Sequence, residues 1–220
     1  GLLPNKFYYY RFIALDKTSP VGRTKTLPRG DIDSLKFAVV SCSNWQHGYF
    51  NAYERIAEKS LDAVLHLGDY IYEYGPGNAK NVDRRHLPEH EIITLADYRT
   101  RYSQYHLDAG LKSMRQQHPI ITIWDDHEVA NDAYVEGAQN HQPEEGDFLA
   151  RVAAAKKAYY EWIPIRDGAK HYRTFSFGNL AEVIMLDERL EGKTRPAEGT
   201  SDPRHVEEIL QGLHARGRLR

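Results

Sequence analysis

The sequence predicts an α/β layered domain with a mainly parallel central sheet. Short apolar runs recur along the chain, and each is about as long as one strand. Longer segments with helical apolar spacing lie between them. This alternation of buried strands and helices is typical of folds in which helices cover a parallel sheet.

Three apolar runs are the predicted central strands, at Leu35–Ser41, Asp62–Leu67 and Ile120–Trp124. Their apolar residues are nearly continuous rather than alternating, which indicates strands covered on both faces. Gly68 ends the second run, and Pro119 leads into the third.

Helices are predicted between and after these strands, where apolar residues follow a helical spacing. The segments are Phe50–Lys59, Leu95–Met114 and Phe148–Trp162. The last has three consecutive alanines at its centre, which favours a helix most strongly because alanine has the highest helix propensity.

A β-hairpin is predicted near the end of the chain. Two strand-like segments, Tyr172–Phe177 and Glu182–Leu186, flank Gly178 and Asn179, a pair typical of tight turns. The final stretch, His205–Arg220, is a helical pattern with a basic end and no ligand motif.

The first part of the chain has a different composition. Lys6–Leu15 is rich in aromatic and β-branched residues and is predicted as a strand. One strand cannot form a domain. We therefore expect residues 1–26 to be the C-terminal remnant of an upstream domain, residues 27–34 a Pro/Gly-rich linker, and residues 35–220 the N-terminal part of a second domain.

Composition limits the classes of function. The formal net charge of −2 offers no electrostatic attraction to nucleic acid or anionic membranes, and no nucleic-acid-binding signature is present. No apolar run approaches the length of a membrane span. The single cysteine, Cys42, excludes a disulfide within the chain, and a lone cysteine is usually a small apolar core residue.

Polar side chains follow each predicted central strand. Cys42 follows the first and Asp69 the second, and the tetrad 125–128 (Asp-Asp-His-Glu) follows the third. Ligands of open α/β sheets bind at the carboxyl ends of strands, so these groups are expected to converge. Asp69 and Cys42 are weak signals by themselves, because Gly-Asp after a strand is often a turn. Four consecutive ionisable residues after an apolar strand are costly to bury unless paired or bound to metal.

The residue types indicate metal-dependent hydrolysis of a phosphate ester. Carboxylates shared between two cations hold them close enough to clamp a phosphoryl group, and Asp69 is the natural bridge. A thiolate from Cys42 and a phenolate from Tyr72 would favour trivalent iron at one position. Carboxylate and histidine ligands also suit manganese and zinc, so the residues alone do not name the metals. Of Tyr70, Tyr72 and Tyr74, two are expected only to pack.

Several strings resemble one family, the PhoD-type alkaline phosphatases of the calcineurin-like metallophosphoesterase superfamily. They are Ser41-Cys42, residues 66–73 (HLGDYIYE) and residues 124–129 (WDDHEV), with later landmarks at 186–189 (LDER) and 201–204 (SDPR). Residues 8–12 (YYYRF) and 19–24 (SPVGRT) resemble the last strands of that family's immunoglobulin-like N-terminal domain. The resemblance runs nearly from end to end.

The resemblance implies a layered metallophosphoesterase domain that hydrolyses phosphate mono- and diesters with a metal-activated water or hydroxide. It implies Fe³⁺ bound by Cys42, Asp69 and Tyr72, with Asp69 also bridging to Ca²⁺. Asp126 is then a metal-ligand candidate.

The same resemblance makes Asn131 a second, weaker ligand candidate and His127 the catalytic or phosphate-contacting histidine. It further implies a small phosphate ester as substrate and a periplasmic or extracellular site of action.

Three alternatives remain at this point. The family includes phospholipase D-like phosphodiesterases, and the residues do not choose among its activities. Further family ligands are expected downstream of Arg220, so the chain could be a truncated, inactive remnant that binds metal or phosphate. A metal-dependent hydrolase acting on something other than phosphate is the third.

Overall fold

The computed structural model describes residues 1–78, 82–166 and 172–195. Among them, a central sheet has three parallel strands in the order β5 (Phe37–Val40), β6 (Ala63–His66) and β7 (Ile120–Thr122). Phe37 lies opposite Ala63, and Val64 opposite Ile120. All three predicted central strands are confirmed, each with slightly shorter bounds than the apolar run. The mixed α/β architecture is confirmed with them.

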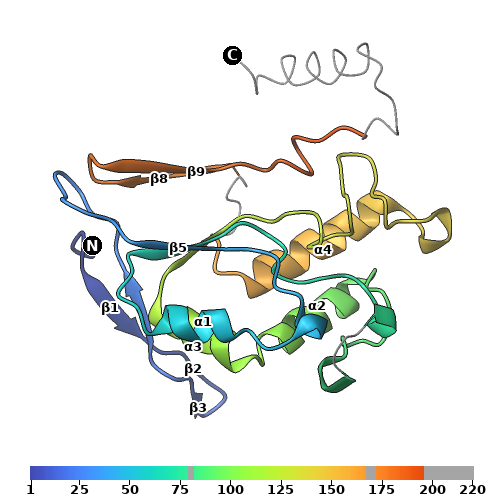
Figure 1. Ribbon diagram of the computed structural model, residues 1–220, viewed down its shortest axis with the longest axis horizontal. Coiled ribbons are helices and arrows are strands. Elements are labelled where there is room, and N and C mark those ends of the chain that lie inside the picture. The colour runs from blue at the N-terminus through green and yellow to red at the C-terminus, as the bar shows by residue number, and fades with distance from the viewer. Residues whose placement is uncertain (79–81, 167–171, 196–220) are drawn as a thin grey trace.

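Helices cover one face of this sheet (Figure 1). They are α1 (Asn51–Ala57), α2 (Leu95–Tyr105), α3 (Ala109–Gln117) and α4 (Phe148–Trp162). Their inward side chains form the larger apolar core together with residues of β6 and the strand-end loops. The bounds predicted for α4 are confirmed. Its first turn is capped by Asp147, whose side chain accepts a hydrogen bond from the Leu149 N–H.

The single helix predicted over Leu95–Met114 is wrong, because the structure has two helices there. Asp108 stands between them, outside helical geometry, and its side chain accepts from the N–H of Leu111. A side chain that satisfies the exposed N–H groups of a new first turn starts a second helix. The apolar spacing continues across the break, so periodicity alone could not reveal it.

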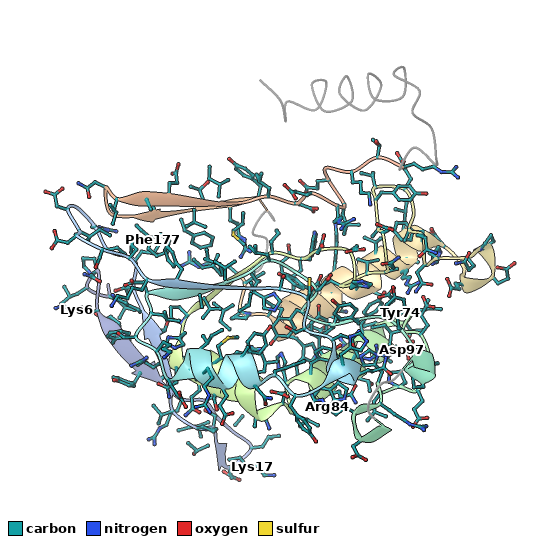
Figure 2. The ribbon with its side chains drawn as sticks, viewed as in Figure 1. Lys6, Lys17, Tyr74, Arg84, Asp97 and Phe177 are labelled. Atoms are coloured by element: carbon teal, nitrogen blue, oxygen red, sulfur yellow. The ribbon has the colours of Figure 1, made fainter. Side chains whose placement is uncertain are left out.

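The opposite face of the sheet carries the predicted hairpin, β8 (Arg173–Phe177) and β9 (Ala181–Met185) (Figure 1). Phe177 lies between the hairpin and the central sheet (Figure 2). Gly178 takes a positive φ of 58° in the turn, which glycine adopts without steric cost. The sheet is therefore covered on both faces, as its continuous apolar runs predict.

The N-terminal segment forms two small antiparallel pairs, β1 (Phe7–Tyr10) with β4 (Gly22–Lys25), and β2 (Ile13–Ala14) with β3 (Lys17–Thr18). The continuous strand predicted over Lys6–Leu15 is thus interrupted after Tyr10.

The same segment contacts the rest of the chain. The Arg23 side chain donates to the carbonyl of Gln117 at 3.0 Å, and Lys25 pairs with Asp62 at 2.5 Å. Figure 2 places Lys6 of this segment on the opposite side of the molecule from Tyr74. The assignment of residues 1–26 to an immunoglobulin-like domain stays a prediction.

Short 3-10 helices complete the described elements, η1 (Trp45–His47), η2 (Pro76–Asn78), η3 (Val82–Arg84) and η4 (Pro143–Glu145). No helix in the described ranges is long and apolar enough to cross a bilayer. The helical pattern predicted at His205–Arg220 and the landmark at 201–204 lie outside the described residues.

Candidate metal centre

The three parallel strands end at the same edge of the sheet, and the predicted site residues follow them there. Cys42 comes two residues after β5, Asp69 three residues after β6, and His127 five residues after β7. The first two loops are joined, because the N–H of Cys42 donates to the carbonyl of Gly68 at 3.2 Å. The structure therefore confirms that these residues lie close together at the carboxyl edge of the sheet.

Asp69, Asp126 and His127 form a buried group in which one ligand atom from each lies within 4.8 Å of the others. One oxygen of Asp69, Oδ1, is buried and has no hydrogen-bond partner among the described residues. Burial raises the pKa of Asp69, against the opposing effect of the His127 charge. An unpartnered buried carboxylate oxygen beside a second carboxylate and an imidazole fits a cation site.

Two further predicted ligands lie around Asp69. The Tyr72 hydroxyl donates to Asp69 Oδ2 at 3.1 Å. Besides burial, both side chains influence the pKa of the neighbouring Cys42 thiol, which the Asp69 charge raises and Tyr72 lowers. Cys42 is exposed, so the alternative that it is an apolar core residue is wrong. Partial burial raises the pKa of its thiol, and burial raises that of the Tyr72 phenol. Without a cation, both groups are held in their protonated forms.

Asn131 contacts the site mainly through its backbone. Its N–H donates to Oε1 of Glu73 at 2.7 Å, while its side-chain amide donates to Gln139 at 2.8 Å. The other tyrosines of the string separate in role. Tyr70 is buried in the helical core, whereas the Tyr74 ring is partly exposed and meets His127 edge to face at 5.2 Å.

Glu73 is the residue that the sequence reasoning missed. Its Oε2 lies 2.7 Å from Nδ1 of His127, and its Oε1 accepts from Asn131 and from the Asn140 side chain at 2.9 Å. Burial alone would lower the pKa of His127, but Glu73, Asp69 and Asp126 together raise it to about 9. Glu73 therefore fixes which ring nitrogen faces the site, because it occupies Nδ1 and leaves Nε2 for other partners.

Glu128 has a matching role on the other loop. Its carboxylate accepts the backbone N–H groups of Asp69 at 3.1 Å, Tyr70 at 2.5 Å and Asp125 at 2.8 Å. It therefore fixes the left-handed turn at Asp69, where φ is 53°. The sequence places Glu73 and Glu128 inside the two recognised strings, but nothing in those strings says which loop each glutamate serves.

Gly68 allows the two loops to approach this closely. Its φ is 101°, and a Cβ built there would lie 2.3 Å from the backbone nitrogen of Asp125. Any larger residue would force the loops apart.

Arg189 brings the landmark at 186–189 to the site. Its guanidinium pairs with Asp125 at 2.5 Å and Asp126 at 3.3 Å. Its positive charge reduces the repulsion between the neighbouring carboxylates of Asp125 and Asp126.

A model of the PhoD-like phosphatase family matches residues 37–213. The chain belongs to this family. It is 46% identical to alkaline phosphatase D of Bacillus subtilis (strain 168), over 86% of this chain and 34% of that protein. A solved structure described as the structure of PhoD matches with a TM-score of 0.85 and 39% identity, over 98% of this chain and 45% of that one.

The chain therefore spans about a third of the length of the curated relative it matches and under half of the solved chain. The family resemblance found in the motif strings is confirmed. The two strings that carry it, 66–73 and 124–129, are the two loops that meet at the buried group.

Proposed function

We propose that this chain carries part of the centre of a metal-dependent phosphoric ester hydrolase acting on phosphate mono- and diesters. The observation that supports it most is the buried group of Asp69, Asp126 and His127, within 4.8 Å of one another at the sheet edge where the family strings meet. Two carboxylates and an imidazole in that arrangement suit cations that bind phosphate oxygens.

Cys42, Asp69 and Tyr72 would hold a ferric ion, since a thiolate and a phenolate are anionic, polarisable donors. Asp69 would also bridge to calcium, with Asp126 and Asn131 as ligands on that side. Bound cations would supply the Lewis acidity that activates a water and neutralises phosphate charge. The identity of both metals is part of the proposal.

His127 would act on the leaving group of the ester. Because Glu73 occupies Nδ1, the ring presents Nε2, the nitrogen that can donate a proton to a departing alcohol oxygen or hydrogen-bond to the phosphate. The Tyr72 ring lies with its centre 4.2 Å from that of His127 and restrains the imidazole from one side.

The test compares wild type, His127→Ala and Cys42→Ser, each with its natural flanking sequence. Rates would be measured on a chromogenic phosphodiester and the corresponding monoester, with metal content by elemental analysis. His127→Ala should lower kcat by about 10²–10⁴-fold while metal is retained. Cys42→Ser should lose iron and activity together.

A wild-type protein that binds neither iron nor calcium and hydrolyses neither ester would contradict the proposal. Unchanged iron content in Cys42→Ser would contradict the ferric assignment alone.

We further propose, from the sequence resemblance, that residues 1–26 end an immunoglobulin-like domain, that residues 27–34 link it to the catalytic domain at 35–220, and that the enzyme acts in the periplasm or outside the cell. Expression with a reporter fused to the natural N-terminal sequence would test the location. Retention of the reporter in the cytoplasm would contradict it.

A further inference from the structure

Two arginines near Glu73 are almost completely buried, Arg101 on α2 and Arg151 on α4, with 0% and 2% of their surface exposed. Burying a guanidinium is costly unless its donors are satisfied. Each therefore marks a place where the surrounding backbone is fixed by directional hydrogen bonds.

Arg101 donates to backbone carbonyls from two segments. Its partners are the carbonyls of Tyr72, Tyr74, Leu87, Pro88 and His90. The first two lie on either side of Glu73, so Arg101 holds the segment that presents Glu73 to His127.

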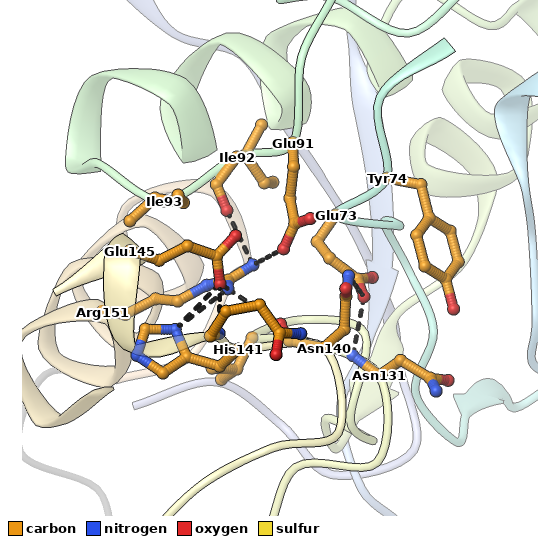
Figure 3. A network of polar contacts seen from close by, with 12 residues as sticks. Glu73, Tyr74, Glu91, Ile92, Ile93, Asn131, Asn140, His141, Glu145 and Arg151 are labelled. Carbon is orange, nitrogen blue, oxygen red and sulfur yellow. Dashed lines mark hydrogen bonds and ion pairs between the residues drawn. The ribbon is translucent and has the colours of Figure 1, made fainter. Parts of the chain in front are cut away.

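Arg151, on α4, is linked to the same glutamate through other residues (Figure 3). It pairs with Glu91 at 2.7 Å and donates to the carbonyls of Ile92 and Asn140, each at 3.0 Å. Its remaining contacts are the Tyr98 hydroxyl at 3.1 Å, Nδ1 of His141 at 3.2 Å and Glu145 at 3.5 Å.

Both carbonyl partners of Arg151 belong to residues that hold Glu73. Asn140 donates its side-chain amide to Glu73 Oε1 at 2.9 Å, and the N–H of Ile92 donates to the Glu73 carbonyl at 3.0 Å. One arm thus fixes the carboxylate and the other fixes the backbone. His127 is the next group along, 2.7 Å from Glu73 Oε2.

We propose that Arg151 is a positioning residue for His127, acting on Glu73 through Asn140 and Ile92. The inference rests on the proposed function of His127. An arginine that only docked α4 would need no more than the pair with Glu91. The planar fork of Arg151 instead binds the two carbonyls whose residues both contact Glu73. Partners outside the ligand set typically change activity by about 10–100-fold when removed.

Asn140→Ala and Arg151→Lys test the relay. Asn140→Ala removes the amide that contacts Glu73 and keeps the backbone carbonyl that receives Arg151. Arg151→Lys keeps the charge beside Glu91 and loses the fork. Both should lower kcat by about 10-fold with KM unchanged.

Arg99→Gln is the matched control, because it breaks another ion pair between α2 and α4, with Glu161 at 2.6 Å, on the surface and away from Glu73. It should leave kcat unchanged.

A second measurement does not depend on metal or activity. In metal-free protein labelled at histidine nitrogens, the Nδ1 proton of His127 should give a downfield signal typical of a short bond to a carboxylate. Asn140→Ala and Arg151→Lys should shift or broaden that signal, and Arg99→Gln should not.

The inference is overturned if either Arg151→Lys or Asn140→Ala keeps both the wild-type kcat and the wild-type ring signal, or if Arg99→Gln loses as much as the relay variants. If Arg151→Lys does not fold, Asn140→Ala still tests the contact through which the relay reaches Glu73, since Asn140 is only partly buried. An inactive wild type would contradict the proposed function, while the ring signal would still decide the positioning role.

Discussion

The loops that follow β6 and β7 are built alike, and each depends on a glutamate from the other. The β6 loop supplies Asp69 to the centre and Glu73 to its neighbour, and the β7 loop supplies His127 and Glu128. Glu73 binds a side chain, the imidazole of His127. Glu128 instead binds the backbone, because its carboxylate accepts hydrogen bonds from the N–H groups of Asp69 and Tyr70.

The two glutamates differ in the charge that faces them. Burial would raise the pKa of Glu73, but the hydrogen bond and charge of His127 lower it overall, together with the Asn140 amide and the Asn131 N–H. Burial and the negative charge of Asp69 raise the pKa of Glu128 to about 8, although three N–H donors oppose this. One carboxylate therefore orients the imidazole of His127, whereas the other shapes the turn that presents Asp69.

The largest expected effect comes from separating the two loops. Gly68→Ala would place a methyl group against the Asp125 backbone at a φ of 101°. A left-handed position for alanine and an overpacked contact together should lower the free energy of unfolding by roughly 2–6 kcal/mol. Urea titration followed by circular dichroism would measure it.

Gly77→Ala is the control, because a Cβ at Gly77 meets nothing within 4 Å. Equal stability of the two variants would show that the loops do not need their close approach.

Exchanging each glutamate for glutamine should separate the two roles. Glu73→Gln should lower kcat by about 10–100-fold, because an amide no longer selects the Nδ1–H form of His127. Glu128→Gln should lower the free energy of unfolding by about 1–3 kcal/mol, because its new N–H₂ faces backbone donors. Ester hydrolysis and urea unfolding would be measured on both proteins. If Glu73→Gln were the less stable and Glu128→Gln the less active beyond its loss of stability, the assigned roles would be reversed.

A smaller effect concerns His86, whose hydrogen-bond partners among the described residues are the Tyr74 carbonyl and the Tyr105 hydroxyl. Burial and the charge of Arg101 lower the pKa of His86 to about 3, despite its bond to the Tyr74 carbonyl. Between pH 6.5 and about 3 the unfolded chain takes up a proton at this histidine that the folded protein does not. In this range the free energy of unfolding should therefore decrease as the pH is lowered, by up to about 1.4 kcal/mol per pH unit from this group.

His86→Gln should remove that part of the slope. Urea titrations at pH 7, 6 and 5 in chelator would measure it. An identical slope in wild type and variant would show that His86 ionises as freely in the folded protein as in the unfolded chain.

Local periodicity determined much of this fold in advance. Continuous apolar runs predicted the three central strands, and the Gly178-Asn179 turn predicted the hairpin that covers their second face. The bounds of α4 followed from helical spacing alone. These features were readable because burial on both faces, or on one helical face, leaves a repeating mark on the sequence itself.

Apolar spacing could not reveal the break between α2 and α3, because the spacing continues through Asp108. The second helix starts there because the Asp108 side chain caps its first turn. Apolar spacing also could not show that Cys42 is exposed beside Asp69 rather than part of the core.

For the candidate metal centre, the order of residues along the chain already shows which side chains stand at the strand ends, because parallel neighbours must end at one edge. The contacts that hold those side chains in place depend on the packing of the folded chain. Glu73 meets His127 across 54 positions of sequence, and Arg151 reaches Glu73 through Asn140 and Ile92. A buried charge takes whichever donors the packed loops bring to it, and that choice depends on distance in space rather than on spacing along the chain.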